Sequence, residues 1–231
     1  YLVAQLISEG HTVMTLDLRN DPSEDLRLQP NPKLETAISD ADYVFFLAFD
    51  VGGSKYLATQ QGTFDFFHNN VRINANVFEQ LHKWKKKFVY TSSQMSNMAH
   101  SPYGSLKMMG EKYCTSLSSF GVVVRFWNVY GFEEDDDKAH VITDFVKMAL
   151  EDGVIRMRTD GEEQRQFLYG GDCAKALTCV MDHHDEFATA GDSIDITSFE
   201  YVSISKVALQ VASIAEQYKN SVEVFRGTAS D

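Results

Sequence analysis

Hydrophobic and polar positions in the first half of the chain follow two alternating periods. Apolar residues recur at helical spacing over 2–7 and Gly10 follows them, which predicts a short helix with a glycine stop. The run Tyr43 to Phe49 is continuously apolar, as is typical of a strand buried on both faces of a parallel sheet. The remaining periodic segments predict helices at 63–84 and 102–119 and strands at 12–18, 88–92 and 122–127. This alternation with short connections predicts an α/β fold with a doubly wound parallel sheet.

After Tyr130 the predicted elements become shorter and the alternation loosens. The pattern there predicts helices at 141–151, 172–181 and 203–217 and strands at 154–157, 167–169, 193–196 and 222–225. We therefore place a domain boundary near Asn128. The prediction is a sheet domain of residues 1–128 and a smaller domain of residues 129–231.

Composition narrows the class of protein. The 231 residues carry 21 Lys and Arg against 33 Asp and Glu, a net charge of -12, which disfavours a broad basic surface for nucleic acid. No apolar run has the roughly 18 to 20 residues that span a bilayer, and no signal-peptide pattern is present. The cysteines, at 114, 173 and 179, lack disulfide or zinc spacing. We expect a soluble, cytoplasmic protein that binds neither nucleic acid nor membrane.

Three residues form a candidate proton-transfer site. Tyr103 and Lys107 are four positions apart on a predicted helix, so their side chains share one face. A phenol is a poor base at neutral pH, and a neighbouring ammonium lowers its pKa by favouring the phenolate. Ser93 ends the preceding strand, at the carboxyl edge where open parallel sheets bind ligands, and can donate a hydrogen bond to the oxygen that Tyr103 deprotonates. The structural alternative is that Ser93 caps a helix and that Tyr103 is packing.

Asp17 lies at the end of the predicted strand 12–18. In a dinucleotide fold a carboxylate there accepts hydrogen bonds from the adenosine ribose and repels a 2′-phosphate, which favours NAD over NADP. Arg19 weakens that preference because a guanidinium accommodates the phosphate, and a strand-end Asp is also a common turn former. A glycine-rich phosphate loop is expected between a first strand and the first helix, just before Tyr1, and neither Gly52-Gly53 nor Gly170-Gly171 has the spacing to replace it. We expect the chain to lack its first strand and loop and a last stretch of the second domain.

Seven segments carry a more specific signal in their order along the chain. They are VMTLDLR (13–19), VFFLAFDVGG (44–53), HNNVRINANVFE (68–79), FVYTSSQMS (88–96), SPYGSLKMMGE (101–111), VVVRFWNVYG (122–131) and GEEQRQFLYGGDCAKAL (161–177). Together they resemble the extended short-chain dehydrogenase/reductase superfamily, in its nucleotide-sugar epimerase and dehydratase branch. The resemblance implies a Rossmann-like domain followed by a smaller substrate domain, with dimeric relatives and a place in polysaccharide biosynthesis.

The resemblance also implies roles for single residues. Tyr103 is then the acid/base, Lys107 its pKa-lowering and ribose-binding partner, and Ser93 the hydroxyl that orients the substrate oxygen. Cofactor-contact positions fall on Asp17, Arg19, Leu47, Ala48, Asn70, Lys107 and Trp127. Nucleotide-sugar positions fall on Ser93, Asn128, His140 and Arg165. Arg165 matches the arginine that grips the diphosphate, a role that suits a guanidinium, although an ordinary surface charge is the alternative.

Departures from the pattern bear on the reaction. Val51 to Gly53 and Ala139 to Ile142 resemble GDP-fucose synthase and GDP-mannose 3,5-epimerase, but Met95 stands where those enzymes have a proton-transferring Cys. Gln94-Met95 likewise replaces the Asp-Glu pair of 4,6-dehydratases. The main prediction is an NAD-dependent epimerase that acts on a nucleotide-diphosphate sugar through a 4-keto intermediate. A dehydratase or ketoreductase is the nearest alternative, and a non-catalytic dinucleotide-binding or regulatory protein is the alternative from another class.

Two further predictions concern partners. The acidic run 133–137 is expected to be solvated, and no metal site is predicted. The apolar faces of the helices that carry Phe67 and Tyr103 are candidates for a homodimer interface, or for packing within one subunit.

Overall fold

The computed structural model describes residues 1–98, 100–117, 119–190, 192–218 and 221–229, and its internal contacts divide the chain into two compact units. Unit 1 contains residues 1–50, 59–126 and 171–196. Unit 2 contains residues 51–58, 127–170 and 197–231. The division after Phe126 lies close to the boundary predicted at Asn128. The structure differs from that prediction in returning 171–196 to unit 1, because this segment supplies a strand to the parallel sheet.

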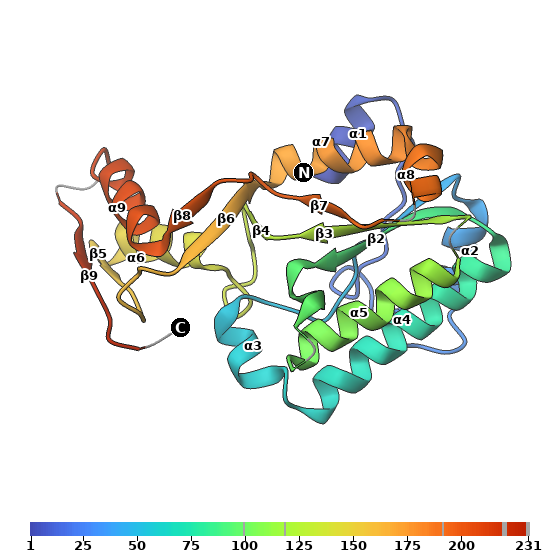
Figure 1. Ribbon diagram of the computed structural model, residues 1–231, viewed down its shortest axis with the longest axis horizontal. Coiled ribbons are helices and arrows are strands. Elements are labelled where there is room, and N and C mark those ends of the chain that lie inside the picture. Colours follow the sequence, from blue (N-terminus) through green and yellow to red (C-terminus); the bar gives the residue numbers. More distant parts are fainter. Residues whose placement is uncertain (99, 118, 191, 219–220, 230–231) are drawn as a thin grey trace. The chain divides into compact units, whose positions relative to one another are not determined.

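Unit 1 is a parallel sheet between helices. Its elements are α1 (Leu2–Ser8), the 3-10 turn η1 (Pro22–Glu24), α2 (Pro32–Asp40), β1 (Tyr43–Phe46), α4 (Phe64–Trp84), β2 (Lys87–Ser93), the 3-10 turn η2 (Gln94–Asn97), α5 (Pro102–Ser116), β3 (Gly121–Phe126), α7 (Gly170–Asp182), α8 (His184–Ala190) and β7 (Ile194–Ile196). The strands lie in the order β1-β2-β3-β7 and every pair is parallel. Helices α4 and α5 lie on one side of this sheet and α1 and α7 on the other (Figure 1). The doubly wound α/β prediction is therefore confirmed.

The core of unit 1 explains why β2 is central. Six of its seven residues are buried, and Phe88 and Tyr90 pack with Phe46 of β1 and Phe78 of α4. Buried aromatic and β-branched residues suit a strand that is covered on both faces. Thr63 caps α4, and its side chain accepts a hydrogen bond from the Phe66 N–H. The helix is present as predicted, but its buried face includes Phe66, Ile73 and Val77, whereas Phe67 of the predicted apolar face is 48% exposed.

The segment predicted as strand 12–18 is not a strand in the structure. It runs without regular secondary structure up to a turn that begins at Leu18. A strand exists only when its backbone pairs with a neighbour, and none of the strands among the described residues pairs with this segment. Local β-propensity alone does not supply that partner.

Unit 2 has two small sheets and its own core. Its elements are α3 (Ser54–Gln60), β4 (Asn128–Tyr130), α6 (Val141–Glu151), β5 (Val154–Arg156), β6 (Gln164–Tyr169), β8 (Tyr201–Ser203), α9 (Ile204–Ala215) and β9 (Glu223–Phe225). One sheet has the order β4-β6-β8 and the other pairs β5 with β9. Helices α6 and α9 pack together around Phe145, Ile155 and Ala208. Among the described residues no helix is both long enough and apolar enough to cross a bilayer.

Candidate active site

Ser93, Tyr103 and Lys107 come together in unit 1, where β2 ends and α5 begins. All three are buried. Ser93 is the last residue of β2, and Tyr103 and Lys107 lie on the first two turns of α5, on the face turned toward β2. The carboxyl end of a central parallel strand is the edge at which open α/β sheets bind ligands.

The start of α5 is fixed by its sequence. The Ser101 side chain accepts a hydrogen bond from the Gly104 N–H at 3.2 Å, and Pro102 occupies the first turn, where its missing N–H costs nothing. Gly104 is required by close approach, because a Cβ there would lie 2.3 Å from the Met95 carbonyl oxygen. The turn η2 therefore packs directly on the first turn of α5 beside Tyr103. This role of Gly104 was not predicted, because only the folded structure brings Met95 beside it.

Burial dominates the electrostatics of Tyr103. Burial raises the pKa of its phenol, and an interaction with the Ser93 hydroxyl lowers that pKa by less, so the result lies above the usual range. The Lys107 Nζ is 5.9 Å from the centre of the Tyr103 ring. The Phe49 ring lies edge-on to Tyr103, with ring centres 5.6 Å apart, and contributes to the apolar surroundings.

Lys107 is a buried cation with few partners. Its Nζ donates a hydrogen bond to the Thr91 carbonyl oxygen at 2.8 Å, which is the one acceptor that the described residues give it, and lies 3.9 Å from the centre of the Phe49 ring. Burial lowers the pKa of Lys107 to about 7, although the Glu111 carboxylate raises it. The ammonium therefore keeps N–H groups for a further acceptor.

Ser93 caps a turn and also interacts with Tyr103. Its hydroxyl oxygen accepts a hydrogen bond from the Met95 N–H at 3.2 Å, so it caps the turn η2. The same hydroxyl interacts with Tyr103. A capping role thus does not exclude a role beside the phenol.

Asp17 and Arg19 form a local pair in unit 1. The Asp17 carboxylate accepts hydrogen bonds from the Arg19 N–H at 2.9 Å and from its Nη2 at 3.2 Å. Burial raises the pKa of Asp17, but these hydrogen bonds outweigh it, so the pKa lies below its usual value. The carboxylate is ionised at neutral pH and remains accessible.

The loop after β1 contains the next predicted contacts. Leu47 is exposed and Ala48 half-buried directly beyond the end of β1. Asn70 on α4 is fully buried, and its side chain accepts from the Asp50 N–H at 2.7 Å and donates to the Asp50 and Phe66 carbonyl oxygens. The structure thus shows Asn70 holding this loop to α4.

The remaining predicted residues belong to unit 2. Trp127 lies edge-on to Tyr201, with ring centres 6.3 Å apart. The buried Oδ1 of Asn128 has no hydrogen-bond donor among the described residues.

Arg165 on β6 donates from Nη1 to the Gln164 carbonyl oxygen at 2.9 Å. His140 precedes α6, and its Nδ1 lies 2.5 Å from the Glu133 carboxylate.

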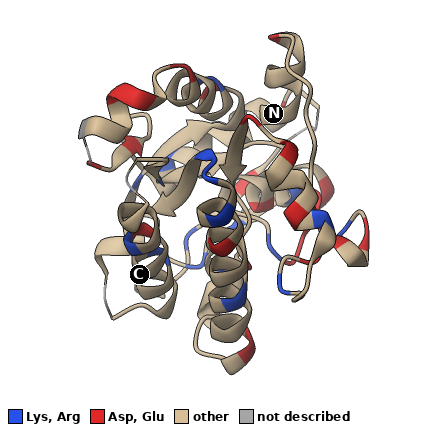
Figure 2. Cartoon of the chain, turned by 90° about the vertical axis from the view of Figure 1, so that its right-hand side faces the viewer, with Lys and Arg blue, Asp and Glu red and all other residues tan. Residues whose placement is uncertain are grey.

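The acidic run in unit 2 has protein partners. Glu133 accepts hydrogen bonds from His140 and from the Thr143 hydroxyl, and Asp136 pairs with Lys147. Within the described ranges no group of three His, Cys, Asp or Glu side chains is placed to hold a metal ion. On the face drawn in Figure 2, Lys and Arg lie dispersed among Asp and Glu rather than in one stripe.

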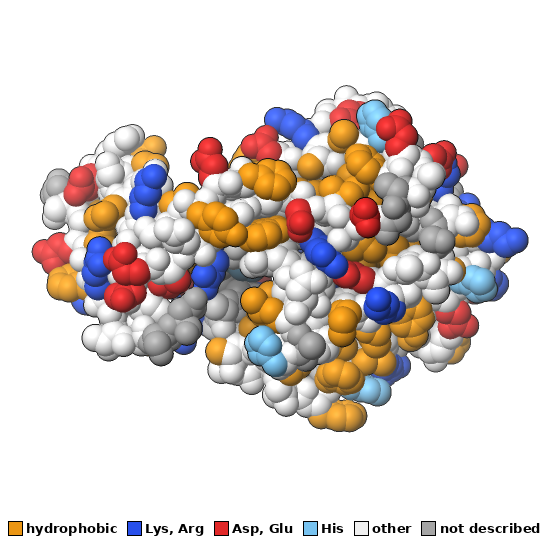
Figure 3. Space-filling model, in the orientation of Figure 1, with side chains coloured by type: hydrophobic (Ala, Val, Ile, Leu, Met, Phe, Trp, Pro, Cys, Tyr) orange, Lys and Arg blue, Asp and Glu red, His pale blue; other side chains and the backbone are white. Residues whose placement is uncertain are grey.

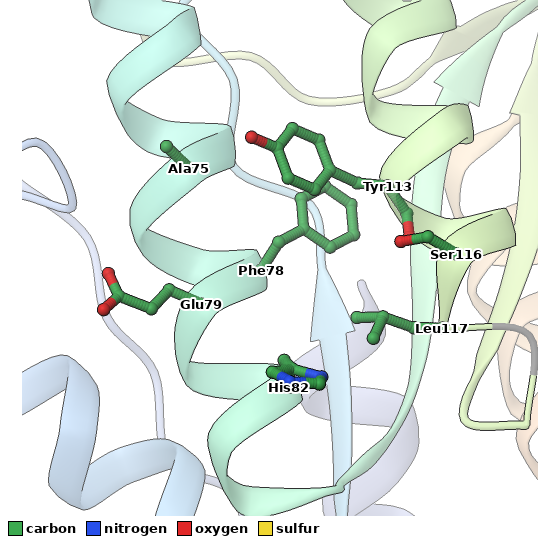
Figure 4. A pocket seen from close by; sticks show the side chains of 7 residues that line it. All are labelled: Ala75, Phe78, Glu79, His82, Tyr113, Ser116 and Leu117. Atoms are coloured by element: carbon green, nitrogen blue, oxygen red, sulfur yellow. The ribbon is translucent and has the colours of Figure 1, made fainter.

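A shallow pocket of about 400 Å³ lies between α4 and α5, away from the predicted catalytic residues. Phe78 of α4 and Tyr113 of α5 stack at its centre, with ring centres 4.9 Å apart (Figure 4). Its other lining residues are Ala75, Glu79, His82, Ser116 and Leu117.

Comparison with known proteins identifies the class of protein. The model of the NAD dependent epimerase/dehydratase family matches residues 1–196, so the chain belongs to that family. The predicted relationship is confirmed, and NAD, the predicted cofactor, is the cofactor of this family.

The individual relatives are similar to this chain at low sequence identity or over only part of its length. An uncharacterised UDP-glucose epimerase of Bacillus subtilis (strain 168) is 33% identical over 119 residues, which are 50% of this chain and 36% of that protein. The UDP-N-acetyl-alpha-D-glucosaminuronate decarboxylase of Bacillus cytotoxicus is 23% identical over 97% of this chain and 79% of its own length. The structure of MoeE5 in complex with UDP-glucuronic acid and NAD has a TM-score of 0.77 at 22% identity, over 99% of this chain and 81% of that one. At this identity the structural likeness shows the fold alone.

Proposed function

We propose that the protein is an NAD-dependent epimerase that acts on a nucleotide-diphosphate sugar through a transient 4-keto intermediate. The observation that carries the proposal is the buried group of Ser93, Tyr103 and Lys107 at the carboxyl end of β2. Membership of the epimerase/dehydratase family supports it.

The residues present fit NAD. Lys107 has N–H groups to offer a ribose diol, and the accessible Asp17 carboxylate can accept from ribose hydroxyls and repel a 2′-phosphate. Leu47, Ala48 and Trp127 supply apolar contacts, and Asn70 holds the loop that carries the first two.

Bound NAD supplies a reversible acceptor for hydride from the sugar carbon. Arg19, which is tied to Asp17, is the residue that would have to turn for NADP to bind.

The protein's own part is proton transfer at the sugar C4 hydroxyl. Tyr103 as phenolate removes the hydroxyl proton while the C4–H bond gives up its hydride, which leaves a C4 ketone. Ser93 donates a hydrogen bond to that oxygen, and the Lys107 charge opposes the effect of burial by favouring the phenolate. After the ketone turns in the pocket, Tyr103 returns the proton and hydride returns to the other face.

Unit 2 carries the proposed substrate contacts. Arg165 can bind a diphosphate through its guanidinium, and the unpaired Oδ1 of Asn128 suits a donor group of the ligand. His140, oriented by Glu133, offers its other ring nitrogen. The names of the relatives support a UDP sugar as the first choice.

We propose that a second copy of the chain covers α4 and α5. Phe64, Phe67, Val71 and Ala75 follow helical spacing on α4, and Phe64 is 77% and Phe67 48% exposed. Hydrophobic side chains gather at the lower right of Figure 3, over these two helices. The stripe continues into the groove that Phe78 and Tyr113 line. Exposed apolar stripes of this kind are typical of interfaces.

Two further points concern the location of the protein and the other activities of the family. The cytoplasm stays our proposed location, because the cysteines at 114, 173 and 179 are all free thiols. Dehydratase and ketoreductase activities remain alternatives within the family, and Gln94-Met95 offers neither an acid nor a base for dehydration.

The test is incubation of the full-length protein and NAD with UDP-, GDP-, dTDP- and CDP-sugars, scored by product identity. An epimer without net NADH consumption supports the proposal. A 4-keto-6-deoxy product, a pentose product with released CO2, or net NADH use would replace it with another activity. NAD binding without turnover on any sugar would support the non-catalytic alternative.

A further inference from the structure

Glu111 lies one helical turn beyond Lys107 on α5 and is held from two strands. The Ser92 hydroxyl of β2 donates to its Oε1 at 2.6 Å. Arg125 of β3 donates from Nε to Oε1 at 2.9 Å and from Nη2 to Oε2 at 2.8 Å. Ser92 and Arg125 are directly paired in the β2–β3 register, so one carboxylate bridges adjacent strands and the helix.

This bridge adjoins the proposed catalytic group. Lys107 donates to the carbonyl of Thr91, the residue before Ser92, and Ser93 follows directly. Two successive turns of α5 are thereby fixed to Thr91 and Ser92, directly before Ser93. A bidentate Arg–carboxylate pair has a defined geometry, unlike a pair that shares a single hydrogen bond.

We propose that Glu111 is a positioning residue of the active site: its carboxylate, held by Ser92 and Arg125, fixes α5 against the end of β2 and places a negative charge one helical turn from Lys107. The role of Lys107 in catalysis rests on the proposed function, whereas the effect of Glu111 on Lys107 does not.

The charges around Lys107 support this assignment. The titratable groups that face it are Tyr103 and Glu111 from α5 and Tyr90 from β2, while Arg125 of β3 acts through Glu111. From α4, Asn74 contributes a polar side chain that carries no charge. Glu111 is thus the negative charge that raises the pKa of Lys107, against burial that lowers it to about 7.

The first test needs neither substrate nor cofactor. Lysine side chains labelled with ¹³C are titrated by NMR in the wild type and in Glu111→Gln, with Lys107 assigned from its loss in Lys107→Met. The expected result is a fall in the Lys107 pKa of about 1 in Glu111→Gln, since an opposite charge nearby shifts a pKa by about 1 to 3. Glu111→Asp keeps the charge and should largely restore the titration. An unchanged Lys107 titration in Glu111→Gln would overturn the proposal.

Asp25→Asn is the matched control. Asp25 also holds an arginine, Arg27, through two hydrogen bonds of 2.8 Å, and its side chain is 16% exposed against 13% for Glu111. Both substitutions break a bidentate pair in unit 1, but only Glu111→Gln should lower the pKa of Lys107.

If Glu111→Gln does not fold, the double variant Glu111→Gln with Arg125→Met removes both charges, and a smaller fall of the Lys107 pKa is expected. No fall in the double variant would then contradict the proposal.

Kinetics separate this inference from the proposed function. With an active substrate, the loss of kcat at high pH should move to lower pH in Glu111→Gln, so that kcat at about pH 8 falls up to tenfold while Asp25→Asn stays near the wild type. If the Lys107 pKa falls in Glu111→Gln but the protein turns over no sugar, the inference about Glu111 holds and the proposed function is refuted. Turnover in which the high-pH limb is the same in both proteins would refute the kinetic role of Glu111.

Discussion

The Lys107 ammonium lies 3.9 Å from the centre of the Phe49 ring, in a position from which solvent is nearly absent. A cation over an aromatic face is stabilised by about 2 kcal/mol when both are desolvated. Phe49 also lies against the Tyr103 ring. One aromatic side chain from the loop after β1 therefore touches both residues of the proposed proton-transfer pair.

The buried charge should be visible as a pH dependence of stability. The pKa of Lys107 is about 7 in the folded protein against an ordinary value of 10.5 in the unfolded chain, so the unfolded state binds more protons between these values. Stability due to this group therefore rises as the pH increases from about 7 to about 10. The Lys107→Met variant lacks this dependence and should exceed the wild type by up to about 5 kcal/mol at pH 6.

Urea unfolding of both proteins between about pH 6 and pH 9.5 measures this difference. The advantage of Lys107→Met should shrink steadily as the pH rises. A constant difference between the two proteins would mean that Lys107 titrates normally.

Removing the phenol hydroxyl should slow the chemistry strongly and spare the fold. In Tyr103→Phe, kcat should fall by about 10²- to 10⁴-fold, since this is the usual contribution of a general acid/base. NAD affinity and the unfolding midpoint should stay close to the wild type, because the ring and its packing against Phe49 remain. Steady-state kinetics and NAD titration measure these quantities, and full turnover by the variant would remove Tyr103 from its proposed role.

Asp17 should decide between the two dinucleotides. Replacing Asp17 by Ser removes the charge that repels a 2′-phosphate and the hydrogen bond that Asp17 accepts from Arg19 at 3.2 Å. The ratio of NADP to NAD affinity should then rise at least about tenfold, as for the loss of one charge-assisted hydrogen bond. Calorimetric titration with both cofactors gives the ratio, and an unchanged ratio would place the ribose elsewhere.

The exposed stripe on α4 should govern assembly. Phe67→Glu inserts a charge into the proposed interface and should convert a dimer to monomer in sedimentation velocity. Phe132→Glu is the control, because Phe132 is 78% exposed and lies in unit 2. A wild type that is monomeric at all concentrations, or a Phe67→Glu variant that stays dimeric, would contradict this interface.

The sequence predicts local features well and partnerships between distant segments poorly. The strand predicted at 88–92 is present as β2, whereas the run Tyr43 to Phe49, predicted as a strand buried on both faces, forms a strand only over Tyr43–Phe46, of which Phe46 is the buried residue. The predicted strand 12–18 fails because pairing depends on a neighbour that periodicity does not reveal. Glu111 lies in the segment 101–111, but its role does not follow from the sequence, because its strand partners Ser92 and Arg125 are separated from it by 19 and 14 positions.

The same limit applies to the candidate site. Spacing brings Tyr103 and Lys107 to one helix face, and the strand-helix order brings Ser93 to them. The dominance of burial over the Tyr103 pKa does not follow from spacing, because it depends on Phe49 and on how closely η2 packs at Gly104. Likewise Asn70 matches a cofactor-contact position, but the structure shows its side chain bound to Asp50.

The most direct test of the central claim follows the hydrogen at the sugar C4. The full-length protein and NAD are incubated with UDP-glucose and with UDP-N-acetylglucosamine, each carrying deuterium at C4, and the products are analysed by NMR and mass spectrometry. The account predicts a C4 epimer that retains the deuterium at C4, because hydride leaves and returns without exchange with water. Solvent hydrogen at C4 of the epimerised product would contradict it.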